Sequence, residues 1–389
     1  MTLRATDRVR AVERSSIRRM FDLAEEVDRD LVRLEVGIPD FETPDFVTEA
    51  ACDAARSGHT SYTTNAGNPE LRAAIADHMA TDYEVRVDPN EVLVTAGGME
   101  ALHLAAVSTV NPGEEVVFPT PAFPNYWVQT RLADGVAVPV AMDAETGYDL
   151  DADRLIDAIG PDTALVILCS PNNPTGRVFD PDAIRAVVDA AAEHDAYVLA
   201  DEVYLGLCYD RDPVGIAALT GHPENVLTVN SCSKRYAMTG WRVGWLAGTT
   251  DIVDQATKVR ESTTSCAPSV SQHAALAALT NGDDAAAEMR EAFRNRRDYV
   301  VERIDDIDGL TGTRPEGAFY AFLDPDLPGT SLEIAEHLLE EYGVVLAPGD
   351  GFGEVGNGAV RLSFANSLDR LEAGFDRIER ALADANRSD

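Results

Sequence analysis

The chain has 389 residues, 45% of them hydrophobic, and a formal net charge of −35 from 32 basic and 67 acidic side chains. A chain of this length and composition can bury a large core without disulfides or a structural metal, and its length suggests two domains or one large α/β domain with an appendage. A negative excess of this size repels phosphate backbones and anionic lipid headgroups, which argues against nucleic acid and membrane surfaces as partners.

Lysine is almost absent from the chain. Lys234 and Lys258 are the only two lysines, and the acidic residues are spread through every segment rather than gathered in a tail. Dispersed acidity of this kind is typical of proteins from high-salt environments, where hydrated carboxylates maintain solubility while salt screens ordinary repulsion. An ordinary acidic enzyme is the alternative interpretation.

The cysteines and the apolar segments indicate the compartment. The five cysteines are odd in number and form no CxxC pair, which predicts reduced, buried thiols and neither a disulfide framework nor a zinc site. They are Cys52, Cys169, Cys208, Cys232 and Cys266. No stretch approaches the roughly 18 apolar residues of a membrane span, and residues 1–22 have no apolar signal-peptide core. We therefore expect a cytoplasmic protein.

Seven short apolar runs alternate with helical patterns through the middle of the chain. They are residues 91–97, 114–119, 136–140, 164–170, 196–202, 226–233 and 243–248. This alternation predicts a mostly parallel seven-stranded sheet with helices on both faces. Because ligands of such sheets bind at the carboxyl ends of the strands, the residues that follow each run are candidates for the site.

The pattern changes from about Asp284. A long charged helical stretch over 285–305 is followed by a strand at 317–323, a helix ending near Glu341, strands at 344–348 and 360–365, and a terminal helix. The first 45 residues contain one amphipathic helical segment and a turn-rich stretch, too little for a core of their own. We predict a large α/β domain over 46–285 and a small α+β domain from 1–45 and 286–389.

Lys234 follows the strand VLTVN, in the segment SCSKRYAMTGWRVGW over 231–245. Since the chain otherwise uses arginine for positive charge, a lysine at a strand end suggests a need for a nucleophilic amine, such as one that forms a Schiff base. A solvated surface lysine is the alternative.

With this segment the sequence resembles the fold-type-I pyridoxal-phosphate enzymes, and among them the class I/II aminotransferases. The resemblance covers nearly the whole chain, and nine segments occur in the family's order. They are VGIPDF, YTTNAGNPELR, TAGGMEAL, PTPAFPNY, SPNNPTG, ADEVY, SCSKRYAMTGWRVGW, PEGAFY and PGDGFGEVGNGAVRLSFA. The resemblance implies an amino-acid:2-oxo-acid aminotransferase that uses pyridoxal 5'-phosphate in a ping-pong cycle.

The resemblance assigns residues to the cofactor's ring. It implies that Lys234 binds the cofactor and carries protons, and that Asp201 faces the pyridine nitrogen and keeps it protonated. Asn173 and Tyr204 would donate hydrogen bonds to the phenolate oxygen. Taken alone, Asp201 could cap the next helix, and SPNNPTG could equally be an ordinary turn.

The cofactor's phosphate needs donors and positive charge. The turn before a helix at Gly98 and Met99 offers backbone N–H groups, and Ser231, Ser233 and Arg242 supply hydroxyls and a guanidinium.

Aromatic residues are assigned less directly. Tyr62 resembles the tyrosine that reaches the phosphate of a neighbouring subunit, which implies a homodimer with composite sites; a half-buried core tyrosine is the alternative. Phe123 falls where the family stacks a ring over the cofactor. Core packing is the alternative for Phe123 and for nearby Tyr126 and Trp127.

Arg361 lies in the middle of a predicted strand, on the face opposite Val360, Leu362 and Phe364. By resemblance it grips the substrate α-carboxylate together with Asn173, with Gly37 allowing the backbone to approach that carboxylate. An exposed edge arginine is the alternative. No second cation for a side-chain carboxylate can be assigned, so dicarboxylate specificity stays open.

Three other functions are alternatives to an aminotransferase. A pyridoxal-phosphate β-lyase or decarboxylase would share Lys234, Asp201 and Asn173, because the pocket decides which bond breaks. A non-catalytic ligand sensor is disfavoured by the charge and by the lack of a helix-turn-helix pattern. A nicotinamide dehydrogenase lacks its GxGxxG turn, and the histidines form no metal motif.

Overall fold

A seven-stranded sheet forms the centre of the larger part of the molecule in the computed structural model, which describes residues 5–10, 12, 16–27 and 29–387. The strands, in spatial order, are β2 (Val92–Thr95), β8 (Gly244–Ala247), β7 (Val226–Ser231), β6 (Tyr197–Asp201), β5 (Thr163–Cys169), β3 (Glu115–Thr120) and β4 (Val136–Ala141). β8 runs antiparallel to both of its neighbours, and all the other pairs are parallel. The predicted mostly parallel sheet is confirmed.

Both faces of this sheet are buried, which explains why its strands are continuous apolar runs. On β5, Leu165 and Ile167 belong to one core cluster, while Val166 and Leu168 belong to another on the opposite face. Successive side chains of a strand point to opposite faces, so each residue of the run has a core to enter.

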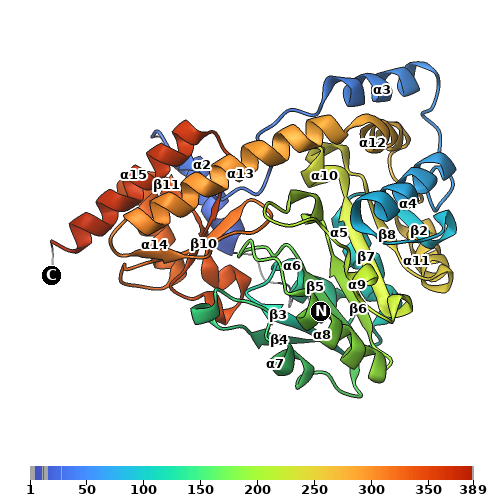
Figure 1. Cartoon of the computed structure of the whole chain (residues 1–389), viewed down its shortest axis with the longest axis horizontal. Coiled ribbons are helices and arrows are strands. Elements are labelled where there is room, and N and C mark those ends of the chain that lie inside the picture. The colour runs from blue at the N-terminus through green and yellow to red at the C-terminus, as the bar shows by residue number, and fades with distance from the viewer. Residues whose placement is uncertain (1–4, 11, 13–15, 28, 388–389) are drawn as a thin grey trace.

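Helices cover the two faces of the sheet. α5 (Gly98–Thr109) and α11 (Thr250–Thr263) contribute to the cluster on one face, and α7 (Ala152–Ile156) and α8 (Pro181–Glu193) to the cluster on the other. The shorter helices of this part are α6 (Asn125–Leu132), α9 (Ile216–Leu219) and α10 (Cys232–Arg235). The fold is therefore an α/β sandwich with the predicted helices on both sides (Figure 1).

Three further helices pack together beside the β2 edge of the sheet. They are α3 (Asp45–Arg56), α4 (Pro69–Tyr83) and α12 (Ser269–Asn281), with α12 in contact with both of the others. Figure 1 shows this group at the end of the molecule opposite the C-terminus.

The C-terminal part has an antiparallel four-stranded sheet in the order β12 (Ala347–Pro348), β13 (Val360–Ser363), β10 (Tyr320–Pro325) and β9 (Leu310–Gly312). Its helices are α13 (Asp283–Asp306), α14 (Ser331–His337), which a π-helical turn over Leu338–Tyr342 extends, and α15 (Leu368–Ala385). In Figure 1, α13 runs from this part to the neighbourhood of α12.

The N-terminal segment joins the C-terminal part, as its small apolar content suggests. β1 (Val32–Arg33) pairs in parallel with β11 (Val344–Val345), and α2 (Ser16–Glu26) contacts β12 and α14. α1 (Asp7–Arg10) instead lies against α6. Residues 1–4, 11, 13–15, 28 and 388–389 of the predicted small domain lie outside the described residues, and the domain boundaries at 45 and 285 stay a prediction.

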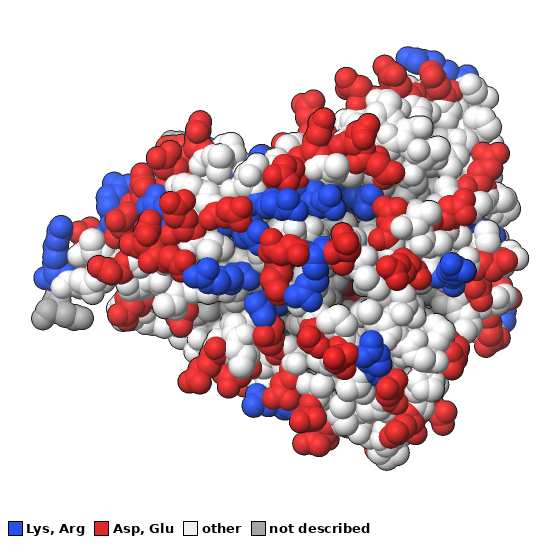
Figure 2. Space-filling model, in the orientation of Figure 1, with Lys and Arg blue, Asp and Glu red and all other residues white. Residues whose placement is uncertain are grey.

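Acidic side chains spread over the whole face of the molecule in Figure 2, with basic side chains gathered in a band across its middle. Among the described residues, no helix is both long enough and apolar enough to cross a membrane. Cys169, Cys208 and Cys232 are buried free thiols, but Cys52 is exposed and Cys266 partly so. The prediction of burial is wrong for Cys52 because it follows the buried Ala51 on α3 by one residue and so turns away from the packed face.

Candidate active site

A cavity of about 1230 Å³ lies where the carboxyl ends of β5, β6 and β7 face the C-terminal part of the chain. All the predicted site residues except Tyr62 line it: Gly37, Gly98, Met99, Phe123, Asn173, Asp201, Tyr204, Ser231, Ser233, Lys234, Arg242 and Arg361. The parallel strands bring the residues at their ends to one edge of the sheet. Arg361 and Gly37 reach the same cavity from the smaller part.

Lys234 lies in α10, one turn after the end of β7. The hydroxyl of Ser231 caps this helix by accepting from the N–H of Ser233 at 3.3 Å, and Lys234 Nζ donates to the carbonyl of Gly37 at 2.7 Å. Burial, and then the guanidinium groups of Arg361 and Arg242, lower the pKa of the lysine to about 8. About a tenth of the amine is thus unprotonated at pH 7, far more than at the ordinary lysine pKa of 10.5, and the unprotonated amine is the form that a nucleophile requires.

Asp201 is the last residue of β6 and is buried. Its Oδ2 accepts from the Tyr126 hydroxyl at 2.7 Å, and its Oδ1 accepts from the N–H of Val203 at 3.4 Å. Burial raises the pKa of this carboxyl to about 6, against the opposing effect of the Tyr126 hydrogen bond. Among the described residues no cation lies within ion-pair distance of Asp201, and the more distant charge of Lys234 has the smallest of the effects that lower its pKa.

Two tyrosines and one asparagine line the same cavity as the lysine. The hydroxyls of Tyr204 and Tyr320 are 3.0 Å apart, and burial raises the pKa of Tyr204 well above its ordinary value, which keeps a proton available for donation. The Oδ1 of Asn173 accepts a hydrogen bond from Arg361, so the side-chain amide nitrogen is the group of Asn173 that can donate to a ligand. A Cβ on Gly37 would lie 2.0 Å from the Tyr320 hydroxyl oxygen, which explains the glycine there.

Arg361 is 4% exposed, so the alternative of an exposed edge arginine is wrong. Its Nη1 donates to Asn173 Oδ1 at 3.0 Å and its Nη2 to the carbonyl of Glu35 at 2.6 Å. The guanidinium carbon lies 4.3 Å from the ring centroid of Tyr320, and its Nε has no hydrogen-bond partner among the described residues. A cation held by its neighbours and still short of acceptors is suited to an anionic ligand.

Residues 95–98, between β2 and α5, form the turn for which the sequence predicts anion binding, the anion-binding turn. Gly97 has φ 85° and is the N-cap of α5, which begins at Gly98. Gly98 and Met99 line the cavity, so the N-terminus of this helix lies at its wall. Arg242 packs against this turn, donating to the carbonyls of Thr239 at 2.8 Å and Ala96 at 3.2 Å. A Cβ at Gly97 would lie 2.4 Å from Arg242 Nη2, so a glycine is needed for this approach.

The four aromatic residues singled out from the sequence differ in their burial and in their contacts. Tyr62 is 86% exposed, so a half-buried core tyrosine is wrong for it. Phe123 and Trp127 line the cavity while also packing against the core cluster of the central sheet. Tyr126 is buried, but its hydroxyl is bound to Asp201, which core packing alone does not describe.

Sequence reasoning missed three contributors to the site. Tyr126 and Tyr320 stood inside quoted motifs without a role, and the carbonyl of Glu35 was not considered. Two further cations, Arg18 and Arg131, line the cavity. From the sequence alone, no second cation is assigned to the site. Arg18 forms an ion pair with Asp22 at 2.9 Å. Neither arginine lies in a recognisable motif, so only the folded chain places them here.

Comparison with known proteins identifies the class. The family model "Aminotransferase class I and II" matches residues 29–378. The chain is 38% identical over 384 residues to the putative aminotransferase YugH of Bacillus subtilis, covering 98% of this chain and 99% of that one. It is 35% identical to the aspartate aminotransferase of Pyrococcus horikoshii, covering 97% and 96%. The aspartate aminotransferase of Thermus thermophilus solved with maleate superimposes with a TM-score of 0.93 at 37% identity, covering 98% and 100%.

The fold and the cavity thus define a fold-type-I pyridoxal-phosphate enzyme. The chain belongs to the class I and II aminotransferases, it is an amino-acid aminotransferase, and its cofactor is pyridoxal 5'-phosphate. The residues present fit that group: a buried carboxylate lacks a cationic partner, an amine of lowered pKa faces it, and a helix N-terminus with Arg242 offers an anion site.

Proposed function

We propose that Lys234, Asp201 and Arg361 carry out both half-reactions of amino-acid transamination in this one cavity. When bound, pyridoxal 5'-phosphate supplies an electron sink for the electrons of the substrate's Cα–H bond. The proposal is carried by a single observation, that an amine of lowered pKa, a buried carboxylate without an ion-pair partner and a buried arginine line the same cavity.

Each side chain has a physical task in this scheme. Lys234 holds the cofactor and, once released, moves a proton to and from the substrate Cα, for which a pKa of about 8 is well matched. Asp201 would stay charged beside a protonated ring nitrogen, because a nearby cation favours the charged form of a carboxyl. Asn173 and Tyr204 would donate to the ring's phenolate oxygen, and residues 97–99 with Ser231, Ser233 and Arg242 would hold the phosphate.

Arg361 binds the α-carboxylate that every amino acid and 2-oxo acid shares. Its contacts with Asn173 and Glu35 and its position over Tyr320 fix the plane of the guanidinium before the substrate arrives. A guanidinium in a fixed plane can donate two parallel hydrogen bonds to a carboxylate.

We also propose that two copies of the chain form a homodimer in the cytoplasm. The support is Tyr62, a large side chain that is 86% exposed and is not among the residues that line its own cavity. In a dimer it would complete the phosphate site of the other copy. Tyr62→Phe would then weaken cofactor binding without changing the folded state of the single chain.

The test is a panel of amino donors assayed with 2-oxoglutarate and with pyruvate, measuring formation of the new oxo acid. Transamination requires turnover that depends on the oxo-acid acceptor. A β-lyase or decarboxylase would turn over without any acceptor, and turnover of that kind at the full rate would refute the proposal.

A further inference from the structure

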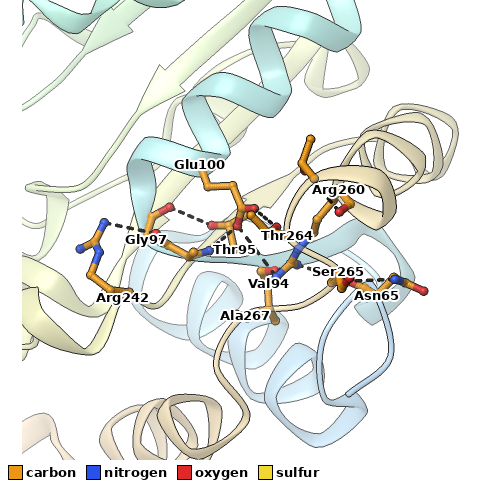
Figure 3. Close-up of polar contacts among 12 residues, drawn as sticks. Asn65, Val94, Thr95, Gly97, Glu100, Arg242, Arg260, Thr264, Ser265 and Ala267 are labelled. Carbon is orange, nitrogen blue, oxygen red and sulfur yellow. Dashed lines mark hydrogen bonds and ion pairs between the residues drawn. The ribbon is translucent and has the colours of Figure 1, made fainter. Parts of the chain in front are cut away.

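A polar cluster that runs from the buried Arg260 to the exposed Thr264 lies behind the anion-binding turn, outside the cavity lining. Glu100, at the third position of α5, accepts from the N–H of Ala96 at 2.5 Å and from the hydroxyl of Thr264. Its other neighbour is Arg260 of α11, whose Nη2 lies 3.9 Å from Glu100 Oε2. Figure 3 shows these three side chains meeting on one side of the turn, with Arg242 on the other.

We propose that Glu100, held in place by Arg260 and Thr264, positions the turn that binds the cofactor's phosphate. Gly97 occupies the N-cap and has no side chain to cap the helix. Glu100 instead fixes the residue before the N-cap, by reaching back from the first helical turn to accept from the N–H of Ala96. The carbonyl of the same residue, Ala96, accepts from Arg242. The two polar groups of Ala96 are therefore fixed from opposite sides.

The negative charge of Glu100 would by itself repel a phosphate at this helix end, but the positive charge of Arg260 offsets it. Arg260 is 0% exposed and donates to the carbonyls of Val94 and of Asn65, the latter at 3.1 Å. Burial lowers its pKa, and the charge of Glu100 is the largest effect in the other direction. The ion pair thus stabilises a cation in the core and offsets the carboxylate, leaving Glu100 to act through its hydrogen bonds.

Further contacts stiffen the same stretch. The Thr95 hydroxyl donates to the carbonyl of Gly97 at 3.0 Å. Asn65 Nδ2 donates to the carbonyl of Ser265 at 3.0 Å, next to Thr264. The turn is held by contacts on both sides, so that its free N–H groups point in a fixed direction. Preorganised donors of this kind bind an anion without first losing conformational freedom.

This inference rests on the proposed function, because it assumes that residues 97–99 bind the phosphate. It is tested with the cofactor-free full-length protein, titrated with pyridoxal 5'-phosphate and with pyridoxal, which lacks the phosphate. We expect Glu100→Ala to raise the dissociation constant for the phosphate ester about tenfold to a hundredfold, as expected for lost hydrogen bonds to a charged group. Pyridoxal binding should change by less than about threefold. Inorganic phosphate should compete with the phosphate ester for the site, and its inhibition constant in that competition should rise along with the dissociation constant of the ester.

Two more variants sharpen the test. Glu333→Ala is the matched control, because Glu333 occupies the same helix position in α14 and accepts from the N–H of Thr330 at 2.8 Å, outside the cavity lining. It should leave both titrations unchanged. Thr264→Val removes one partner of Glu100 at an exposed position and should shift phosphate-ester binding several-fold in the same direction, which keeps the test available if Glu100→Ala does not fold.

The inference would be wrong if Glu100→Ala weakened the binding of pyridoxal 5'-phosphate and of pyridoxal equally, or if it left the binding of the phosphate ester as tight as in the unmodified protein. Either result would leave the proposed function standing. If the unmodified protein bound pyridoxal 5'-phosphate no better than pyridoxal, the phosphate assignment and the proposed function would fail with it.

Discussion

Arg361→Lys is the substitution that most directly tests how the cavity recognises its substrates. The change keeps a positive charge but removes the planar fork, along with the two hydrogen bonds that orient it toward Asn173 and the Glu35 carbonyl. A lysine would also lose the stacked position 4.3 Å from the Tyr320 ring centroid.

The magnitude follows from the burial of the site. Arg361 is 4% exposed, so solvent screens the lost contact little. A hydrogen bond to a charged group is worth about 1.5 to 3 kcal/mol, and each 1.36 kcal/mol corresponds to a factor of ten. We expect kcat/KM to fall about ten- to a hundredfold for every amino acid and every 2-oxo acid alike.

The assay is steady-state kinetics of both half-reactions, with the cofactor's absorbance recorded in parallel. Arg303→Lys is a suitable control, because Arg303 forms its ion pairs with Asp376 and Glu379, which like Arg303 are absent from the cavity wall. Amines without a carboxylate should react equally with both proteins. A loss confined to dicarboxylates would show that Arg361 reads the substrate side chain, and the reasoning above would be wrong.

Four further outcomes are expected. Borohydride reduction of the holoenzyme, followed by peptide mapping, should find the pyridoxyl group on Lys234 and not on Lys258; label on Lys258 alone would contradict the assignment. In the cofactor-free protein, the pH dependence of competitive acylation, also followed by peptide mapping, should give Lys234 a pKa near 8, below the ordinary 10.5. Asp201→Asn should keep the fold by circular dichroism while turnover drops by orders of magnitude, because a neutral amide does not keep the ring nitrogen protonated. Tyr126→Phe should raise the pKa of Asp201 further, because the hydroxyl that now lowers it is gone, and turnover should fall about tenfold with the acid limb of its pH profile moved upward; an unmoved limb would argue against it. Raising salt from 0.1 M to 2 M should raise the unfolding temperature, because screening weakens the repulsion among 67 acidic side chains.

The sequence determined the central sheet and the chemical type of the site. Continuous apolar runs such as that of β5 are what a strand buried on both faces requires, and their alternation with helical patterns leaves a parallel sheet as the expected arrangement. The scarcity of lysine made Lys234 conspicuous, and the ordered motifs around it supplied the family. The strand ends then became the place to look, because parallel strands gather their carboxyl ends at one edge.

Only the tertiary structure decided which side chains hold the site together. Tyr126 meets Asp201 across 75 residues, Tyr204 meets Tyr320 across 116, and Asn173 meets Arg361 across 188. Such pairs follow no local period, because they depend on how strands, helices and the C-terminal part pack against one another. The alternation along 360–364 put Arg361 on one face of a strand, but burial of both faces and the neighbours that orient the guanidinium come from packing in three dimensions.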